Sequence, residues 1–241
     1  MTVESFDVSY EADGLAMRSM LFKPEAGMEN GRGVVVFPDI LGLGAHALDR
    51  ARRLAEMGYL ALAADVRGER RILSMGDIGP ILDSMAKDRT GWRIRAHAAI
   101  EALLGESNLD ETRLAAIGYC FGGALALELA RSGADIAGVA GFHCALDALA
   151  PDEAQNIRGK ILVCIGANDP LVNCEQRTAF EQEMRAADVD WRLHLYGGVV
   201  HSFTDPAADM MGNTAVARYD AAADARSWTE MIDFFEDAFR D

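Results

Sequence analysis

The strongest constraint in this sequence is its alternation of short apolar runs with longer segments of helical periodicity. Runs such as 33–37 and 161–165 are apolar throughout, which is typical of strands that are covered on both faces. Helical segments separate most of these runs, and this order predicts a mostly parallel sheet with helices on both faces. We expect strands at 3–10, 17–22, 33–37, 59–63, 114–118, 136–140, 161–165 and 191–196, and helices at 46–57, 92–104, 122–132, 174–187 and 220–239.

The first two expected strands, 3–10 and 17–22, look like an antiparallel pair that opens the fold. The last, 191–196, alternates polar and apolar residues and is expected near an edge of the sheet. No internal repeat or linker interrupts the chain, and 241 residues suit one domain of this class. We therefore expect a single α/β domain over residues 1–241.

The charge and the cysteines exclude several classes of protein. The chain carries 38 acidic and 23 basic residues, a net charge of −15, which disfavours binding to nucleic acid or to an anionic membrane surface. The uncharged stretch 114–127 is too short to span a bilayer. The first residues are acidic where an export signal would be basic, so we expect a cytoplasmic protein. Its four cysteines form no CxxC motif, and we expect reduced thiols and no metal site.

A glycine-rich turn directly follows the expected strand 114–118. Its sequence, Gly118-Tyr119-Cys120-Phe121-Gly122, is the G-x-S-x-G nucleophile elbow with cysteine in place of serine. The glycines are needed because the chain passes too close to itself for side chains there. The turn also places the sulfur at a helix N-terminus, which favours the thiolate. Cys120 is therefore our candidate nucleophile.

A cysteine nucleophile needs a base and a group that orients the base. Among the five histidines, His201 alone stands where a base is expected, just after the last strand. Asp169 lies in a turn that ends the strand 161–165. The order nucleophile, acid, histidine is that of the α/β-hydrolases, so we expect Cys120, Asp169 and His201 to form a triad in an α/β-hydrolase fold.

An oxyanion hole is expected beside the nucleophile. Its donors would be the backbone N–H of Phe121, directly after Cys120, and that of Ile40 in the loop after the strand 33–37. The same loop holds a G-x-G-x-x-A pattern beginning at Gly42. In a dinucleotide-binding fold these glycines follow the strand at once, whereas residues 38–41 intervene here. No cofactor is expected.

These motifs together resemble those of the dienelactone hydrolase family. The resemblance rests on the G-Y-C-x-G-G elbow, a G-x-x-D-x-x-V turn around Asp169 and an H-S-F turn beginning at His201, and it runs from about residue 15 to the C-terminus. It implies a minimal α/β-hydrolase without a large lid. It also implies hydrolysis of lactones and esters by a Cys-His-Asp triad without metal or organic cofactor, usually in a cytoplasmic monomer. We expect a monomer or a weak homodimer.

Two positions depart from the family. The glutamate that holds the resting thiol is matched here by Asp39, which is one methylene shorter and has either this gating role or only a turn role. The arginine that grips the substrate carboxylate is replaced by Asp205, although Arg67 or Arg70 would supply a cation if either reaches the site. The resemblance thus gives Arg67, Ser202, Phe203 and Asp205 as candidate pocket residues. It predicts the family's reaction for this chain better than it predicts the family's substrate.

We therefore expect hydrolysis of a small ester or lactone through an acyl-cysteine intermediate. The same triad would also suit acyl transfer or peptide hydrolysis. A thiol at a helix N-terminus would equally suit a redox or electrophile sensor without turnover. A catalytically silent binding fold is a further alternative.

Overall fold

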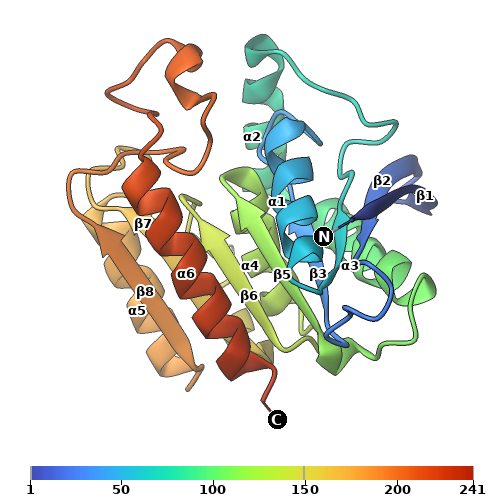
Figure 1. The fold of residues 1–241 in the computed structure, drawn as a ribbon. Coiled ribbons are helices and arrows are strands. Elements are labelled where there is room, and N and C mark those ends of the chain that lie inside the picture. Colours follow the sequence, from blue (N-terminus) through green and yellow to red (C-terminus); the bar gives the residue numbers. More distant parts are fainter. Residues whose placement is uncertain (1, 149, 241) are drawn as a thin grey trace.

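The computed structural model describes residues 2–148 and 150–240. Within them the chain forms eight strands and six α-helices in α/β order, as the sequence predicts (Figure 1). The strands are β1 (Glu4–Ala12), β2 (Leu15–Lys23), β3 (Gly33–Phe37), β4 (Leu60–Ala63), β5 (Leu114–Tyr119), β6 (Gly138–Phe142), β7 (Lys160–Gly166) and β8 (Trp191–Tyr196). The α-helices are α1 (Ala45–Glu56), α2 (Ile78–Lys87), α3 (Thr90–Gly105), α4 (Phe121–Arg131), α5 (Cys174–Ala186) and α6 (Ala221–Ala238). Short 3₁₀ turns are η1 (Met75–Asp77), η2 (Glu111–Arg113), η3 (Pro151–Asn156) and η4 (Ala208–Met211).

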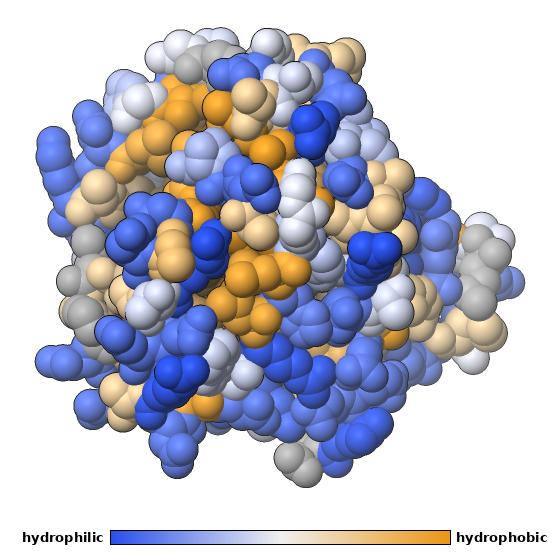
Figure 2. Space-filling model, turned by 90° about the vertical axis from the view of Figure 1, so that its left-hand side faces the viewer, coloured by the Kyte–Doolittle hydropathy of each residue, from blue (hydrophilic) through white to orange (hydrophobic). Residues whose placement is uncertain are grey.

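All eight strands belong to one sheet, in the order β1-β2-β4-β3-β5-β6-β7-β8. The expected antiparallel pair is present, since β1 pairs with β2 from Glu4 opposite Lys23 to Ala12 opposite Leu15. Strand β2 is antiparallel to β4, and every pair from β4 to β8 is parallel. Strand β8 lies at the edge, as its alternating sequence predicts. Figure 2 views the molecule from the β8 and α5 side and shows polar residues over most of that face, with hydrophobic residues visible between them.

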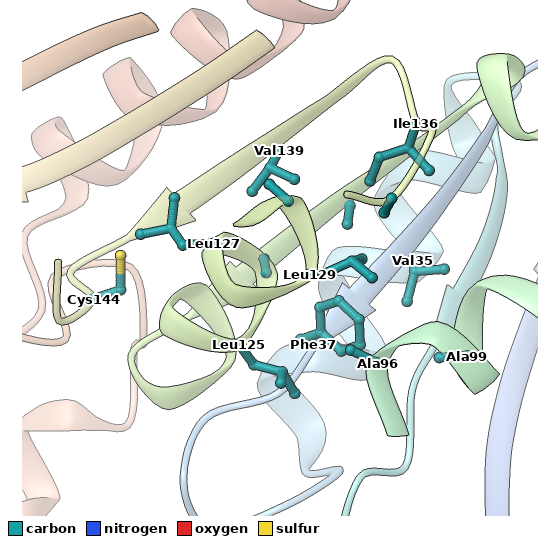
Figure 3. Close-up of a cluster of buried hydrophobic side chains, with 14 of the residues drawn as sticks. Val35, Phe37, Ala96, Ala99, Leu125, Leu127, Leu129, Ile136, Val139 and Cys144 are labelled. Atoms are coloured by element: carbon teal, nitrogen blue, oxygen red, sulfur yellow. The ribbon is translucent and has the colours of Figure 1, made fainter. Parts of the chain in front are cut away.

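Each face of the sheet carries its own hydrophobic core. Side chains alternate along a strand, so Val34 and Val36 of β3 pack in one core with residues of α1 and α6. Val35 and Phe37 point to the opposite face and pack in the other core with residues of α3 and α4, as Figure 3 shows. The near-continuous apolar runs of the central strands are thus explained by burial on both faces.

Helix α2 was not predicted from the sequence, and strand β6 is shifted by two residues. No element was predicted near Ile78–Lys87, and the helix there carries Pro80 within its first turn, where proline is tolerated. Strand β6 begins at Gly138, two residues later than expected, although Ile136 is buried in the core. The other boundaries agree to within two residues.

The parallel strands direct their carboxyl ends to the same edge of the sheet, so the loops that follow β3, β5, β6, β7 and β8 come together there. Among the helices of residues 2–148 and 150–240, none has the length and apolar composition that a membrane crossing requires.

Candidate active site

Cys120 occupies a strained turn between β5 and α4. Its backbone has φ 53° and ψ −117°, a conformation that residues other than glycine rarely adopt. The flanking glycines are required by close contacts: a Cβ on Gly118 would lie 2.0 Å from the carbonyl oxygen of Gly122, and one on Gly122 would lie 2.3 Å from that of Pro38. The elbow leaves the thiol half-buried at the first turn of α4, where the helix dipole favours negative charge.

Asp169 and His201 are joined by a hydrogen bond. Nδ1 of His201 donates to Oδ2 of Asp169 at 2.8 Å, and the other carboxylate oxygen accepts the Leu171 amide at 2.8 Å. Both residues are buried. The pairing fixes the imidazole tautomer, because the proton on Nδ1 leaves Nε2 as the nitrogen that can exchange a proton.

The side of the His201 ring away from Asp169 is close to Cys120. Nε2 is buried and has no nitrogen or oxygen partner among the described residues, and Cys120 is close enough to affect the ring. Burial lowers the pKa of His201, but Cys120 and the hydrogen bond with Asp169 raise it more, to about 10. The imidazole is therefore cationic near neutral pH.

The amides of Ile40 and Phe121 are free in the described part of the chain. Neither N–H donates a backbone or side-chain hydrogen bond there, although Leu41 donates to Oδ1 of Asp39 at 2.8 Å and Gly42 to its carbonyl oxygen at 3.2 Å. Phe121 is the first residue of α4, so its N–H precedes the internal hydrogen bonds of the helix. Both amides remain available for a ligand oxygen.

Asp39 and Asp205 are close neighbours beside this loop. They line a cavity of about 220 Å³ whose walls include Leu41, His46 and Ile72. Burial raises the pKa of Asp39, its hydrogen bond with the Leu41 amide lowers it, and the negative charge of Asp205 raises it further. Among the described contacts, Asp39 makes a turn-type hydrogen bond with Leu41 and none with Cys120.

The other candidate pocket residues are more deeply buried than Asp205. Arg67, Ser202 and Phe203 are all buried, and Phe203 packs against the rings of Tyr196 and His143 at 5.5 and 5.2 Å. Arg70 hydrogen-bonds the carbonyl oxygens of Arg18 and Ser19 and pairs with Asp7, so it holds β2. Of the four predicted pocket residues, only Asp205 lines the cavity described above.

A buried polar layer lies behind His201, where His143 was expected as a packing residue near the cleft because it follows a strand end. The ring of His143 meets that of His201 edge-on, with centroids 5.1 Å apart, and its Nε2 is 2.8 Å from Oγ1 of Thr204. The carbonyl oxygen of Thr204 accepts from Arg50 at 2.5 Å and lies 3.1 Å from Nε2 of His46. His143 directly follows β6, as expected, but its contacts with Thr204 and with the ring of His201 were not predicted.

Nothing in the described part of the chain resembles a metal centre, because no group of three or more His, Cys, Asp or Glu side chains is arranged to hold an ion. All four cysteines are free, and Cys144 and Cys164 are buried. Burial raises the pKa of the Cys164 thiol to about 12, so that thiol stays protonated. Cys120 lies at the elbow before α4, whereas Cys174 is exposed at the first residue of α5.

Comparison with known proteins finds similarity to the dienelactone hydrolase family in both sequence and structure. The sequence profile of the dienelactone hydrolase family matches residues 17–239. The structure resembles that of the dienelactone hydrolase-like promiscuous phosphotriesterase P91 from metagenomic libraries, with a TM-score of 0.94 and 40% identity over 99% of each chain. A structure described as m3DLH is 44% identical, with a TM-score of 0.94 over 99% of this chain and 100% of the other. A probable 2-oxo-3-(5-oxofuran-2-ylidene)propanoate lactonase of Bradyrhizobium sp. is 27% identical and covers 73% of this chain and 75% of its own.

Proposed function

Because this chain belongs to the dienelactone hydrolase family, we propose that it hydrolyses a small ester or lactone through Cys120, His201 and Asp169. The observation that carries this proposal is the 2.8 Å hydrogen bond between His201 and Asp169, together with the approach of Cys120 to the other side of the imidazole. A nucleophile, a base and an orienting acid then lie in the order that acyl transfer requires.

The reaction proceeds in two steps. The thiolate of Cys120 attacks the substrate carbonyl, and the tetrahedral oxyanion is bound by the amides of Ile40 and Phe121. As the intermediate collapses, the imidazolium of His201 donates a proton to the departing alkoxide, which leaves an acyl-cysteine. Neutral His201 then removes a proton from water, hydroxide adds to the thioester, and collapse releases the acid and the thiolate. Asp169 holds the imidazole in one tautomer throughout.

The proposal also includes the cellular compartment, the oligomeric state and the role of Asp39. We place it in the cytoplasm as a monomer or weak homodimer, and its four free cysteines are compatible with a reducing compartment. We keep both possibilities for Asp39, namely gating of the thiol and a turn role, with its hydrogen bond to the Leu41 amide favouring the second.

Phosphotriesters are a second candidate substrate class. The observation that favours them is the 40% identity, over nearly the whole chain, with a protein described as a promiscuous phosphotriesterase. A phosphoryl oxygen would occupy the same pair of amides as a carbonyl oxygen. Turnover of a dialkyl 4-nitrophenyl phosphate, absent in Cys120→Ala, would support this activity, whereas a wild-type rate equal to background would exclude it.

A measurement of catalytic turnover distinguishes a hydrolase from the alternative functions. We expect sustained hydrolysis of 4-nitrophenyl acetate, lost in Cys120→Ala and retained in Cys174→Ala, which replaces an exposed cysteine. Rapid mixing followed by intact-mass analysis should reveal one acetyl group, and peptide mapping should locate it on Cys120. Labelling without turnover would instead indicate a sensor. Preferential transfer of the acyl group to an added alcohol or thiol would indicate an acyl transferase.

A further inference from the structure

The two amides proposed for the oxyanion hole come from loops that are distant in sequence, and one buried side chain contacts both residues. Arg67, in the loop after β4, is only 6% exposed. Its Nη2 donates to the carbonyl oxygen of Ile40 at 2.7 Å, and its guanidinium carbon lies 4.5 Å from the centre of the Phe121 ring. Arg67 thus bridges the loop after β3 and the elbow after β5.

The position of Arg67 is itself fixed from several sides. The buried carboxylate of Asp65 accepts the backbone N–H groups of Arg67 and Gly68 at 2.9 and 3.0 Å. Trp92 covers the guanidinium with its ring centre 4.9 Å away. The two loops are also joined where the Leu73 amide donates to the carbonyl oxygen of Leu41 at 2.8 Å. The guanidinium is therefore held before substrate arrives.

The guanidinium is buried without full compensation of its charge. Its Nε and Nη1 are inaccessible and have no hydrogen-bond partner among the described residues, and no carboxylate there lies within ion-pair distance. Burial lowers the pKa of Arg67 to about 10, so the group remains cationic at neutral pH. An unpaired buried charge is costly, which makes a purely structural role a poor explanation. Because Nε and Nη1 are inaccessible, direct contact with a substrate carboxylate is also disfavoured.

We propose that Arg67 is a positioning residue of the oxyanion hole, whose guanidinium holds the Ile40 carbonyl and the Phe121 ring together and so fixes the spacing of the two amide donors. This inference rests on the proposed hydrolase function. The cation also lies close to the place where negative charge develops in the tetrahedral intermediate. Preorganised donors and charges of this kind stabilise a transition state more than a ground state.

The first test compares Arg67→Ala and Arg67→Lys with Arg95→Ala. Arg95 is a matched control, because it stacks on the same Trp92 ring at 4.3 Å and donates to the carbonyl oxygen of Val66 but lacks contacts with Ile40 and Phe121 among the described residues. With neutral 4-nitrophenyl acetate we expect Arg67→Ala to lower kcat by about 10- to 100-fold with little change in KM, since small displacements of a catalytic group cost that much. Arg67→Lys should lose less, and Arg95→Ala should retain wild-type kcat.

A second readout separates positioning from general disruption. Alkylation of Cys120 by iodoacetamide is a displacement at a saturated carbon and develops no oxyanion, whereas acylation by the ester does. Arg67→Ala should therefore slow acylation and leave the alkylation rate unchanged. Millimolar methylguanidinium should restore acylation in Arg67→Ala and have no effect on Arg95→Ala.

Three results would overturn the proposal: wild-type acylation by Arg67→Ala, equal slowing of acylation and alkylation, or a loss confined to anionic esters, which would make Arg67 a carboxylate-binding residue. If circular dichroism shows that Arg67→Ala is unfolded, Arg67→Lys decides the matter with the same readouts. A wild-type protein that no ester acylates would instead refute the hydrolase function, and that failure is seen before any Arg67 variant is compared.

Discussion

Glu128 and His201 both stand in buried polar clusters, but the two clusters differ in completeness. Glu128, on α4, is fully buried, and both of its oxygens are used: Oε1 accepts from Arg89 at 2.5 Å and Arg131 at 3.1 Å, and Oε2 accepts from Arg93 at 2.7 Å. The same arginines extend the cluster, since Arg93 pairs with Glu153 and Arg131 with Glu183. These pairs connect α3, α4, η3 and α5.

By comparison, the cluster around His201 is unfinished, by which we mean that some of its buried polar atoms have no hydrogen-bond partner among the described residues. Among the described residues, buried side-chain nitrogen or oxygen atoms without a hydrogen-bond or ion-pair partner occur on Arg67, Tyr119, His143 and His201, and none occurs in the Glu128 cluster. Arg67 contacts the loop of Ile40, and the other three lie within or behind the histidine layer. Buried polar groups are nearly always satisfied in folded proteins, so this group of exceptions at one end of the sheet is consistent with the active site that we propose there.

This comparison predicts that substitutions at the unfinished end cost activity rather than stability. His201→Ala should lower kcat/KM by about 10⁴-fold or more, and Asp169→Ala by somewhat less, because members of a triad act as a unit. Ester turnover and urea unfolding measured on the same preparations would check this. His97→Ala, which removes a histidine bonded to Ser132 far from the elbow, is the control and should keep full activity. Normal turnover by Asp169→Ala would move the orienting role to another residue.

In the Glu128 cluster, where the buried polar atoms have partners, we expect substitutions to lower stability. Glu128→Ala should lower the free energy of unfolding by about 3–5 kcal/mol, because it leaves buried arginine charges without their partner. The activity of the folded fraction should be unchanged. Glu56→Ala breaks an exposed pair with Arg52 and should cost less than about 1 kcal/mol. Chemical denaturation curves of both variants provide the measurement, and an equal cost for the two would contradict the contrast drawn here.

The charge coupling within the unfinished cluster can be measured directly. The charge of Cys120 stabilises the imidazolium of His201, and with Asp169 it raises the pKa of His201 to about 10. Cys120→Ala removes that negative charge, so protonation becomes less favourable and the pKa of His201 should fall. NMR titration of the imidazole would follow the change, with Cys174→Ala as a control that leaves the titration unaltered. An unchanged pKa in Cys120→Ala would mean that the two groups do not interact.

The sequence predicted local features well and contacts between distant loops poorly. The elbow around Cys120 is encoded by glycines that lie close together in the sequence, and the order of Asp169 and His201 along the chain was enough to expect them together. In contrast, the contact between His143 and His201 depends on how two loops meet after folding. Burial of Arg67 likewise could not be read from a charged residue in a loop. Helix α2 was not predicted, and it carries Pro80 in its first turn, where proline is tolerated although it breaks helices at most other positions.

The smallest expected effect concerns substrate charge at Asp205, which lines the cavity beside the unfinished cluster together with Asp39. An anionic lactone meets two carboxylates there and should be turned over less efficiently than a neutral one. Asp205→Asn removes one repulsion, so it should raise kcat/KM for the anion by up to about tenfold, roughly 1.4 kcal/mol, with little change for a neutral ester. Asp135→Asn changes the net charge equally at an exposed site paired with Arg158 and controls for long-range attraction. Only the effect of Asp205→Asn should survive high salt, because the half-buried Asp205 is screened less than the exposed Asp135. Equal gains from both variants, or faster wild-type turnover of the anion than of the neutral ester, would show that Asp205 does not select against negative substrates.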